Sequence, residues 1–146
     1  GSRASIGALE AACAFAAGEQ GGIVHAVLCV RLDAMLFTEG PIDLADQAHR
    51  LDELCLGAGD CARVTIQRHI AVGRPDHEIL SMASEVRSDL VVIGTRRRSG
   101  LERALLGSLT DRIVHFAPCP VLVIPEGSTR AHTGAPAREA QMRHDA

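Results

Sequence analysis

The feature that most constrains the fold is an alternation of apolar, strand-length runs with amphipathic, helix-length segments. Strands that are apolar on both faces are typical of a parallel sheet covered by helices on both sides. The alternation therefore predicts an α/β fold with a doubly wound parallel sheet, in which ligands bind at the carboxyl ends of the strands. The expected strands lie within IVHAVLCV (23–30), ARVTIQRHIAVG (62–73), DLVVIGT (89–95) and PVLVIP (120–125).

Helical periodicity between these runs predicts four helices. Pro75 is well placed as the first residue of the third helix, and Asp76 favours the positive end of its dipole. The expected buried stripes are, in chain order, Ile6, Leu9, Cys13 and Ala16; Leu44, Ala48, Leu51 and Cys55; Ile79, Met82, Ala83 and Val86; and Leu109, Ile113 and Phe116.

The two ends of the chain depart from this alternation. Residues 126–146 lack periodicity and are rich in Gly, Ala, Pro and Arg, so we expect a disordered tail after a single domain at 1–125. The sequence enters on a helix, whereas a βαβ unit begins with a strand. We therefore expect either that a first strand is missing from residues 1–146 or that another segment fills its place.

Composition excludes several classes of function. All 15 basic residues are arginine, which rules out mechanisms that need a lysine, including the P-loop lysine and Schiff-base chemistry. A net charge of −3 and the absence of Trp and Tyr argue against nucleic-acid binding. No signal peptide is evident and no apolar run approaches the ~20 residues of a membrane span, so we expect a cytoplasmic protein with no membrane partner.

Cysteine and histidine spacing gives no clear metal site. The chain has five cysteines, an odd number, without a CxxC pair, so reduced thiols are favoured over disulfides or zinc. His25, His69 and His115 fall in strands or near a helix end, where a hydrogen-bonded structural histidine is favoured over a ligand. Cys119, between two prolines, is read as part of a turn rather than as a redox centre.

The segment GTRRRSGLERALLGS (94–108) carries the strongest functional signal. Gly94 ends a strand, which allows a ligand to approach the backbone closely. Ser108 is expected to cap the next helix, because Ser108 and Asp111 fit the capping-box spacing. Free amides at Gly107 and Ser108, aided by Arg96–Arg98, would then form an anion site. The alternative is a solvated loop that needs no ligand.

Residues 73–125, through the whole of GRPDHEILSMASEVRSDLVVIGTRRRSGLERALLGSLTDRIVHFAPCPVLVIP, resemble the second half of the universal stress protein family. The family's hallmark is G-x2-G-x9-G-[ST], and Gly94, Gly107 and Ser108 match it in spacing. Arg97 stands where the second glycine is usual. The opening GSRASIGALEAACAFAA looks like the helix that follows the family's first strand.

The resemblance implies a Rossmann-like sandwich of five parallel strands, similar to adenine-nucleotide α-hydrolases, with the usual first strand missing. It also implies a homodimer formed through the last strand, here residues 120–125. That apolar edge strand by itself invites pairing with another chain, which its flanking prolines would limit.

The resemblance further implies adenine-nucleotide binding, with ATP as the ligand, with or without Mg²⁺. Val30 would lie against adenine or ribose, and Ile93 and Gly94 would face the nucleotide. The phosphates would be held through amides and the hydroxyl of Gly107, Ser108 and Leu109, with Thr110 nearby. Arg97 could either block the close phosphate approach or clamp the phosphates itself.

These features predict a small stress-response regulator or sensor. We find no nucleophile–base pair, so we expect no enzyme, or at most a very slow ATPase, and no catalytic or metal-ligating residues. Two alternatives stay open: a family member that binds no nucleotide and acts through dimerisation and protein contacts, and an ATP-cleaving enzyme.

Overall fold

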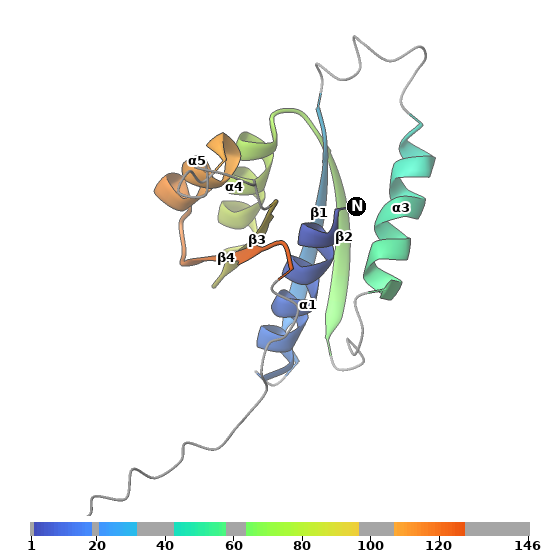
Figure 1. Ribbon diagram of the computed structural model, residues 1–146, viewed down its shortest axis with the longest axis horizontal. Helices are drawn as coiled ribbons and strands as arrows, with labels where there is room; N and C mark the ends of the chain where they lie inside the picture. The colour runs from blue at the N-terminus through green and yellow to red at the C-terminus, as the bar shows by residue number, and fades with distance from the viewer. Residues whose placement is uncertain (1, 19–20, 32–42, 58–63, 97–106, 128–146) are drawn as a thin grey trace, which may run out of the picture.

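The computed structural model describes residues 2–18, 21–31, 43–57, 64–96 and 107–127, and helices and strands alternate along them (Figure 1). The elements are α1 (Arg3–Gly18), β1 (Ile23–Val30), α3 (Leu44–Gly57), β2 (Thr65–Val72), α4 (Pro75–Glu85), β3 (Val91–Thr95), α5 (Ser108–Phe116) and β4 (Val121–Pro125). The predicted α/β alternation is confirmed, and β1 has the predicted limits. The expected tail lies mostly outside the described residues.

All four strands pair in parallel, as predicted, but they form two pairs. β1 pairs with β2 in a register that sets Ile23 opposite Thr65, and β3 pairs with β4 with Val91 opposite Val121. Within the described ranges, no hydrogen-bonded ladder joins one pair to the other. The two pairs are therefore connected through helices rather than through a shared sheet.

Helix α1 makes the larger part of that connection, to which α4 contributes by contacting β1, β2 and Val91 of β3. Helix α1 packs mainly against β3, and also against β4 and β1. Its first turn lies directly on Gly94 of β3, where an added Cβ would collide with the main-chain carbonyl of Ala4. Ala4 itself is buried, as are Ala8 and Cys13 further along the helix. Small residues on this face allow the helix to approach the strand closely.

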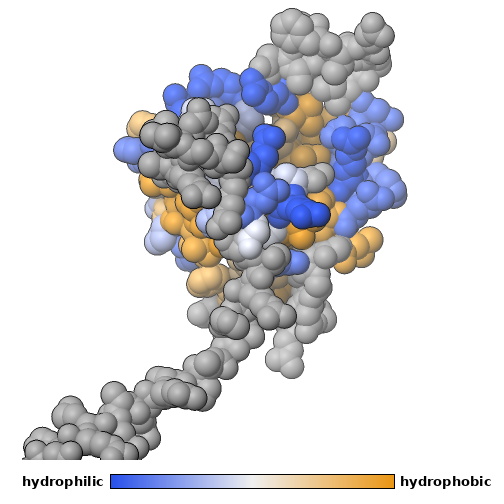
Figure 2. All heavy atoms as spheres, in the orientation of Figure 1, coloured by the Kyte–Doolittle hydropathy of each residue, from blue (hydrophilic) through white to orange (hydrophobic). Residues whose placement is uncertain are grey.

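The helices divide between two faces, as a doubly wound fold requires. On one face α3 packs over β1 and β2, with Leu51 and Cys55 buried against Ala26. Its outer side carries the hydrophilic residues visible in Figure 2. On the other face α4 and α5 pack together, and Ala83 and the fully buried Ile113 cover Val91 of β3 (Figure 1).

Two expected core residues lie at the surface. Leu44 is 50% exposed and Phe116 is 67% exposed. Each is the terminal residue of its helix, where less of the neighbouring surface is available to cover a side chain. The inner members of the same stripes, Leu51 and Ile113, are buried as predicted.

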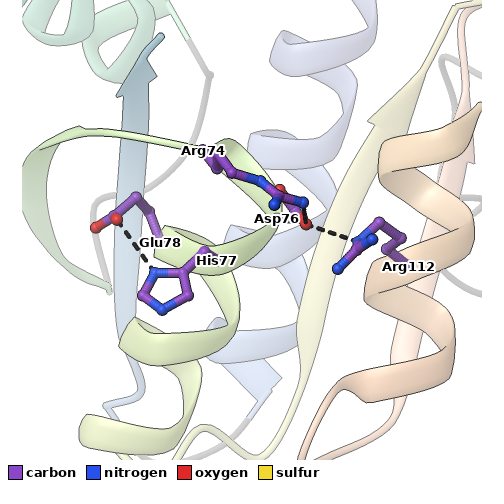
Figure 3. Close-up of polar contacts among 5 residues, drawn as sticks. All are labelled: Arg74, Asp76, His77, Glu78 and Arg112. Carbon is purple, nitrogen blue, oxygen red and sulfur yellow. Dashed lines mark hydrogen bonds and ion pairs between the residues drawn. The ribbon is translucent and has the colours of Figure 1, made fainter. Parts of the chain in front are cut away.

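A buried carboxylate ties α4 to α5 (Figure 3). Asp76, in the first turn of α4, accepts a hydrogen bond from Nη2 of Arg74 at 2.9 Å and pairs with Nε of Arg112 on α5 at 2.6 Å. The Asp76 side chain is 11% exposed, whereas those of Arg74 and Arg112 are 71% and 53% exposed. The ion pair between Asp76 and Arg112 thus links the first turn of α4 to α5.

Burial of the Asp76 carboxyl group acts to raise its pKa, but the hydrogen bond from Arg74 and the positive charges of Arg74 and Arg112 outweigh it. The net effect is a pKa below the ordinary value of 3.8. Relative to the protonated form, the charged form of Asp76 is therefore favoured more strongly in the folded chain than in the unfolded one.

We predict that this ion pair makes stability depend on pH below 3.8. Because the folded pKa is the lower one, the contribution is complete above the unfolded value and is lost as the pH falls through the folded value. Urea unfolding of wild type and Asp76→Asn at a series of pH values measures it: the variant should lose less stability on acidification. Asp46→Asn is the matched control, because it removes the carboxylate of an exposed pair with Arg50 on α3. The stability of this control should change with pH as that of wild type does.

We predict that Gly94→Ala destabilises the fold, because the new methyl group must displace the backbone of α1 at Ala4. Gly18→Ala is the control, since Gly18 lies at the end of α1 and a Cβ there meets nothing within 4 Å. Urea midpoints compare the two variants. A Gly94→Ala midpoint equal to that of Gly18→Ala would contradict the close contact between α1 and β3.

Candidate functional site

The start of α5 is the most open of the predicted positions. Gly107 and Ser108 are both exposed, and no atom of the described residues lies within 4 Å of where a Cβ of Gly107 would be. The first helical hydrogen bond runs from the amide of Asp111 to the carbonyl of Gly107 at 3.0 Å. The amides that precede it have no partner within the helix, as at any helix start.

The expected capping role of Ser108 was wrong. Gly107 is the N-cap residue, with φ −57° and ψ 151°, and Ser108 is the first residue of the helix. A glycine has no side chain with which to accept the amide hydrogen bonds of the first turn, and no side-chain cap is present. Ser108 instead adds a hydroxyl at the exposed surface beside those amides.

Leu109 and Thr110, the next two residues, have side chains that pack into the fold, so mainly their backbone amides are left at the start of α5. The side chain of Leu109 packs against the core that contains Ile113, and Thr110 is only 5% exposed. These contacts hold the first turn of α5 in place and fix the direction of its amides. The contribution of Leu109 to ligand binding through its amide stays a prediction.

The predicted residues of the strands are less accessible than those of α5. The face of Gly94 that lacks a side chain is covered by the carbonyl of Ala4, so α1 uses the space that a ligand was expected to use. Ile93 packs against the core on the side of α4 and α5. Val30 ends β1, in the other pair of strands, and is 7% exposed. Arg97 lies outside the described residues.

Two cations that sequence reasoning missed lie near this end of the helices. Arg112 follows Ser108 by four residues and therefore lies on the same side of α5, one turn along. Arg74 directly precedes α4, and both guanidinium groups contact Asp76. The Arg-Pro-Asp run at 74–76 is a sequence signal for the contact between Arg74 and Asp76, but it does not reveal that Arg112 also contacts Asp76 (Figure 3).

The thiols of Cys29 and Cys119 are not activated nucleophiles. Burial, aided by the charge of Glu78, raises the pKa of Cys29 to about 11. Burial, together with the charge of Asp89, also raises the pKa of Cys119. Both therefore hold their protons at neutral pH, and neither these two nor Cys55 forms a disulfide.

The described part of the chain contains no group of three or more His, Cys, Asp or Glu residues that could hold a metal ion together. The three histidines read as structural make hydrogen bonds. His25 bonds to His69 on the neighbouring strand, and His115 contacts the carbonyl of Asp111. None of the helices in the same ranges is both long and apolar enough to cross a membrane.

The arrangement at the start of α5 can bind an anion. It combines backbone amides without helical partners with the positive end of a helix dipole. Arg112, one turn along, is paired with Asp76. The nine residues of α5, from Ser108 to Phe116, are sufficient for a dipole. Asp111 lies in its first turn and His115 in its last turn, where the dipole favours an acidic and a basic residue. Phosphate and carboxylate groups are the natural ligands of such a site.

Comparison with known proteins supports the resemblance seen in the sequence. A universal stress protein of Methanocaldococcus jannaschii is 44% identical over 61 residues, which are 42% of this chain and 36% of that protein. The match thus spans little more than a third of that relative's length. A universal stress protein YxiE of Bacillus subtilis is 43% identical over 54 residues, 37% of this chain and 36% of that protein.

Solved structures share the fold. A universal stress protein in complex with cAMP aligns with a TM-score of 0.59 at 21% identity, covering 86% of this chain and 90% of the other. An Arabidopsis thaliana universal stress protein family protein with AMP bound aligns with a TM-score of 0.52 at 19% identity, covering 82% and 78%. The family model for universal stress proteins matches residues 1–125. This chain therefore belongs to the universal stress protein family.

Proposed function

We propose that the chain binds an adenine nucleotide, ATP included, with its phosphates at the start of α5, and that it acts as a stress-response regulator or sensor. The observation that carries the proposal is the exposed helix start at Gly107 and Ser108, which has no side-chain cap. Anionic oxygens satisfy amides in this position and interact favourably with the helix dipole.

The choice of an adenine nucleotide rests on the family. Two universal stress proteins with the same fold are bound to cAMP and to AMP. Both ligands combine adenine, ribose and phosphate, so a site for their phosphate at a helix start also suits the longer phosphate chain of ATP. Mg²⁺, if present, would be held through the phosphates, as is usual for this ion.

The proposed role is binding rather than catalysis. The chemistry available at α5 is anion binding, and the thiol pKa values of Cys29 and Cys119 keep these side chains protonated. We expect ATP to stay intact or to be cleaved very slowly. Measuring phosphate release tests this: steady release well above buffer background would favour the ATP-cleaving alternative.

A cytoplasmic location is part of the proposal, since the thiol form of Cys55 is the form a reducing compartment maintains.

One observation favours a second candidate, a family member that binds no nucleotide. The carbonyl of Ala4 covers Gly94, so a ligand that needs close contact with this strand end requires α1 to move. Thermal unfolding with ATP, AMP or cAMP separates the candidates. Binding to the folded state raises the midpoint by mass action, whereas no change at millimolar ligand favours the second candidate.

We predict that Gly107→Asp abolishes nucleotide binding, because a carboxylate at the helix start repels phosphate and occupies its amides. Aspartate is a preferred N-cap residue, so this change should preserve or improve the stability of α5. A loss of binding will then report on the site rather than on unfolding. Calorimetric titration with ATP and AMP measures the effect.

Gly107→Ala is the matched control for this test. It adds a methyl group into open space without charge, so its nucleotide affinity should stay close to that of wild type. If Gly107→Asp binds nucleotide as tightly as Gly107→Ala does, the phosphates lie elsewhere and the assignment to α5 is wrong.

We also propose that two copies of the chain pair through β4. The amide of Val91 bonds to the carbonyl of Pro120, and the amide of Glu126 bonds to the carbonyl of Thr95. Alternation along a strand then directs the main-chain groups of Val121 and Val123 away from β3. Pro125 follows in the same series and lacks an amide proton, which limits pairing to a short stretch.

We predict that Val123→Pro weakens dimerisation, because it removes the outward amide and leaves the hydrogen bonds to β3 intact. Analytical ultracentrifugation over a range of concentrations measures the association. Val72→Pro, at the exposed end of β2, is the control and should associate like wild type. A monomeric wild type, or a Val123→Pro variant that associates equally, would contradict pairing through β4.

A further inference from the structure

Two histidines lie together on neighbouring strands, away from the proposed nucleotide site. In the register of β1 with β2, His25 is opposite Gln67 and His69 is opposite Val27, so the two rings are diagonal neighbours on one face. Nδ1 of His25 and Nε2 of His69 are 3.0 Å apart. The ring centroids are 5.2 Å apart, so the facing nitrogens lie between the rings rather than on their far sides.

That nitrogen separation is close to what one metal ion requires. With metal–nitrogen bonds of about 2.0–2.1 Å, two imidazole nitrogens on a tetrahedral ion are about 3.3 Å apart, and at a right angle they are about 2.9 Å apart. The observed 3.0 Å lies between these values. The 3.0 Å and 5.2 Å separations place both nitrogens almost on the line between the rings, so the rings must turn until their lone pairs converge before an ion can replace the bridging proton. This movement needs no change in strand register.

The surroundings allow an ion to enter and complete its coordination. His25 and His69 are each partly exposed, and Thr65 and Gln67, on the same face of β2, are exposed. Neutral imidazole is a good ligand for Zn²⁺, Ni²⁺ and Cu²⁺. Since the described residues supply no third His, Cys, Asp or Glu here, water must complete the shell.

We propose that His25 and His69 form a binding site for one divalent transition-metal ion that bridges β1 and β2. The ion is held by Nδ1 of His25 and Nε2 of His69, with water in its other positions. Two protein ligands give a reversible site rather than a permanent structural centre. Occupancy ties β1, which ends at Val30, to β2, so it stabilises this half of the fold.

The test is a calorimetric titration of the whole chain with Zn²⁺, repeated with Ni²⁺, for which thiols compete less. We expect one ion per chain, and a dissociation constant at least tenfold higher in His25→Gln and in His69→Gln. The double variant should bind no more weakly than either single variant, because one remaining imidazole cannot chelate. A rise in thermal midpoint with Zn²⁺ should be seen in wild type and be absent in the variants.

His49→Gln combined with His115→Gln is the matched control. These histidines are exposed, and each lies four residues from a carboxylate on its helix, Glu53 and Asp111, so they represent ordinary surface contacts. The control should bind like wild type. Metal affinity that survives in His25→Gln, or that is lost in the control, overturns the proposal.

A measurement without substitution guards against a variant that fails to fold. Zn²⁺ added to the unaltered protein should shift the ring NMR signals of His25 and His69 together, at one equivalent. Shifts confined to other histidines would overturn the assignment. Nucleotide binding at α5 involves neither residue, so the outcome is independent of the proposed function.

Discussion

The packing of α1 across both pairs of strands is the contact on which the rest of the structure depends. Without a hydrogen-bonded ladder between β1 and β3 in the described residues, the two pairs share no backbone connection of their own. Helix α1 touches β1, β3 and β4, and its small residues Ala4 and Ala8 allow close approach. Dispersion and apolar burial along this helix replace the hydrogen bonds of a continuous sheet.

That same contact shapes the candidate site. Gly94, one residue before the end of β3, was expected to admit a ligand, and in the structure it admits the backbone of α1. The start of α5 is unaffected, because Gly107 and Ser108 are exposed and α1 does not cover them. The candidate site is thus a helix start with exposed amides, and its strand side is closed by a helix rather than open to a ligand.

The charged residues show why part of the site escaped sequence reasoning. Asp76 was expected only to favour the dipole of α4, yet it also contacts Arg112, which is 36 positions later in the chain. The approach of α4 to α5 creates this pair, and no local pattern encodes that approach. His25 and His69 are likewise 44 positions apart and meet only because of the register between β1 and β2.

The sequence alone determined the order and kind of the elements, the parallel pairing and, to within one residue, where α5 begins, because apolar periodicity and glycine spacing are local properties. It also determined the family, since the matching motif is continuous along the chain. Only the tertiary structure decided that Gly94 is covered, that Gly107 rather than Ser108 is the N-cap, and which distant side chains meet. Those outcomes depend on how helices and strands approach one another, and that approach is set by the packing of the whole chain.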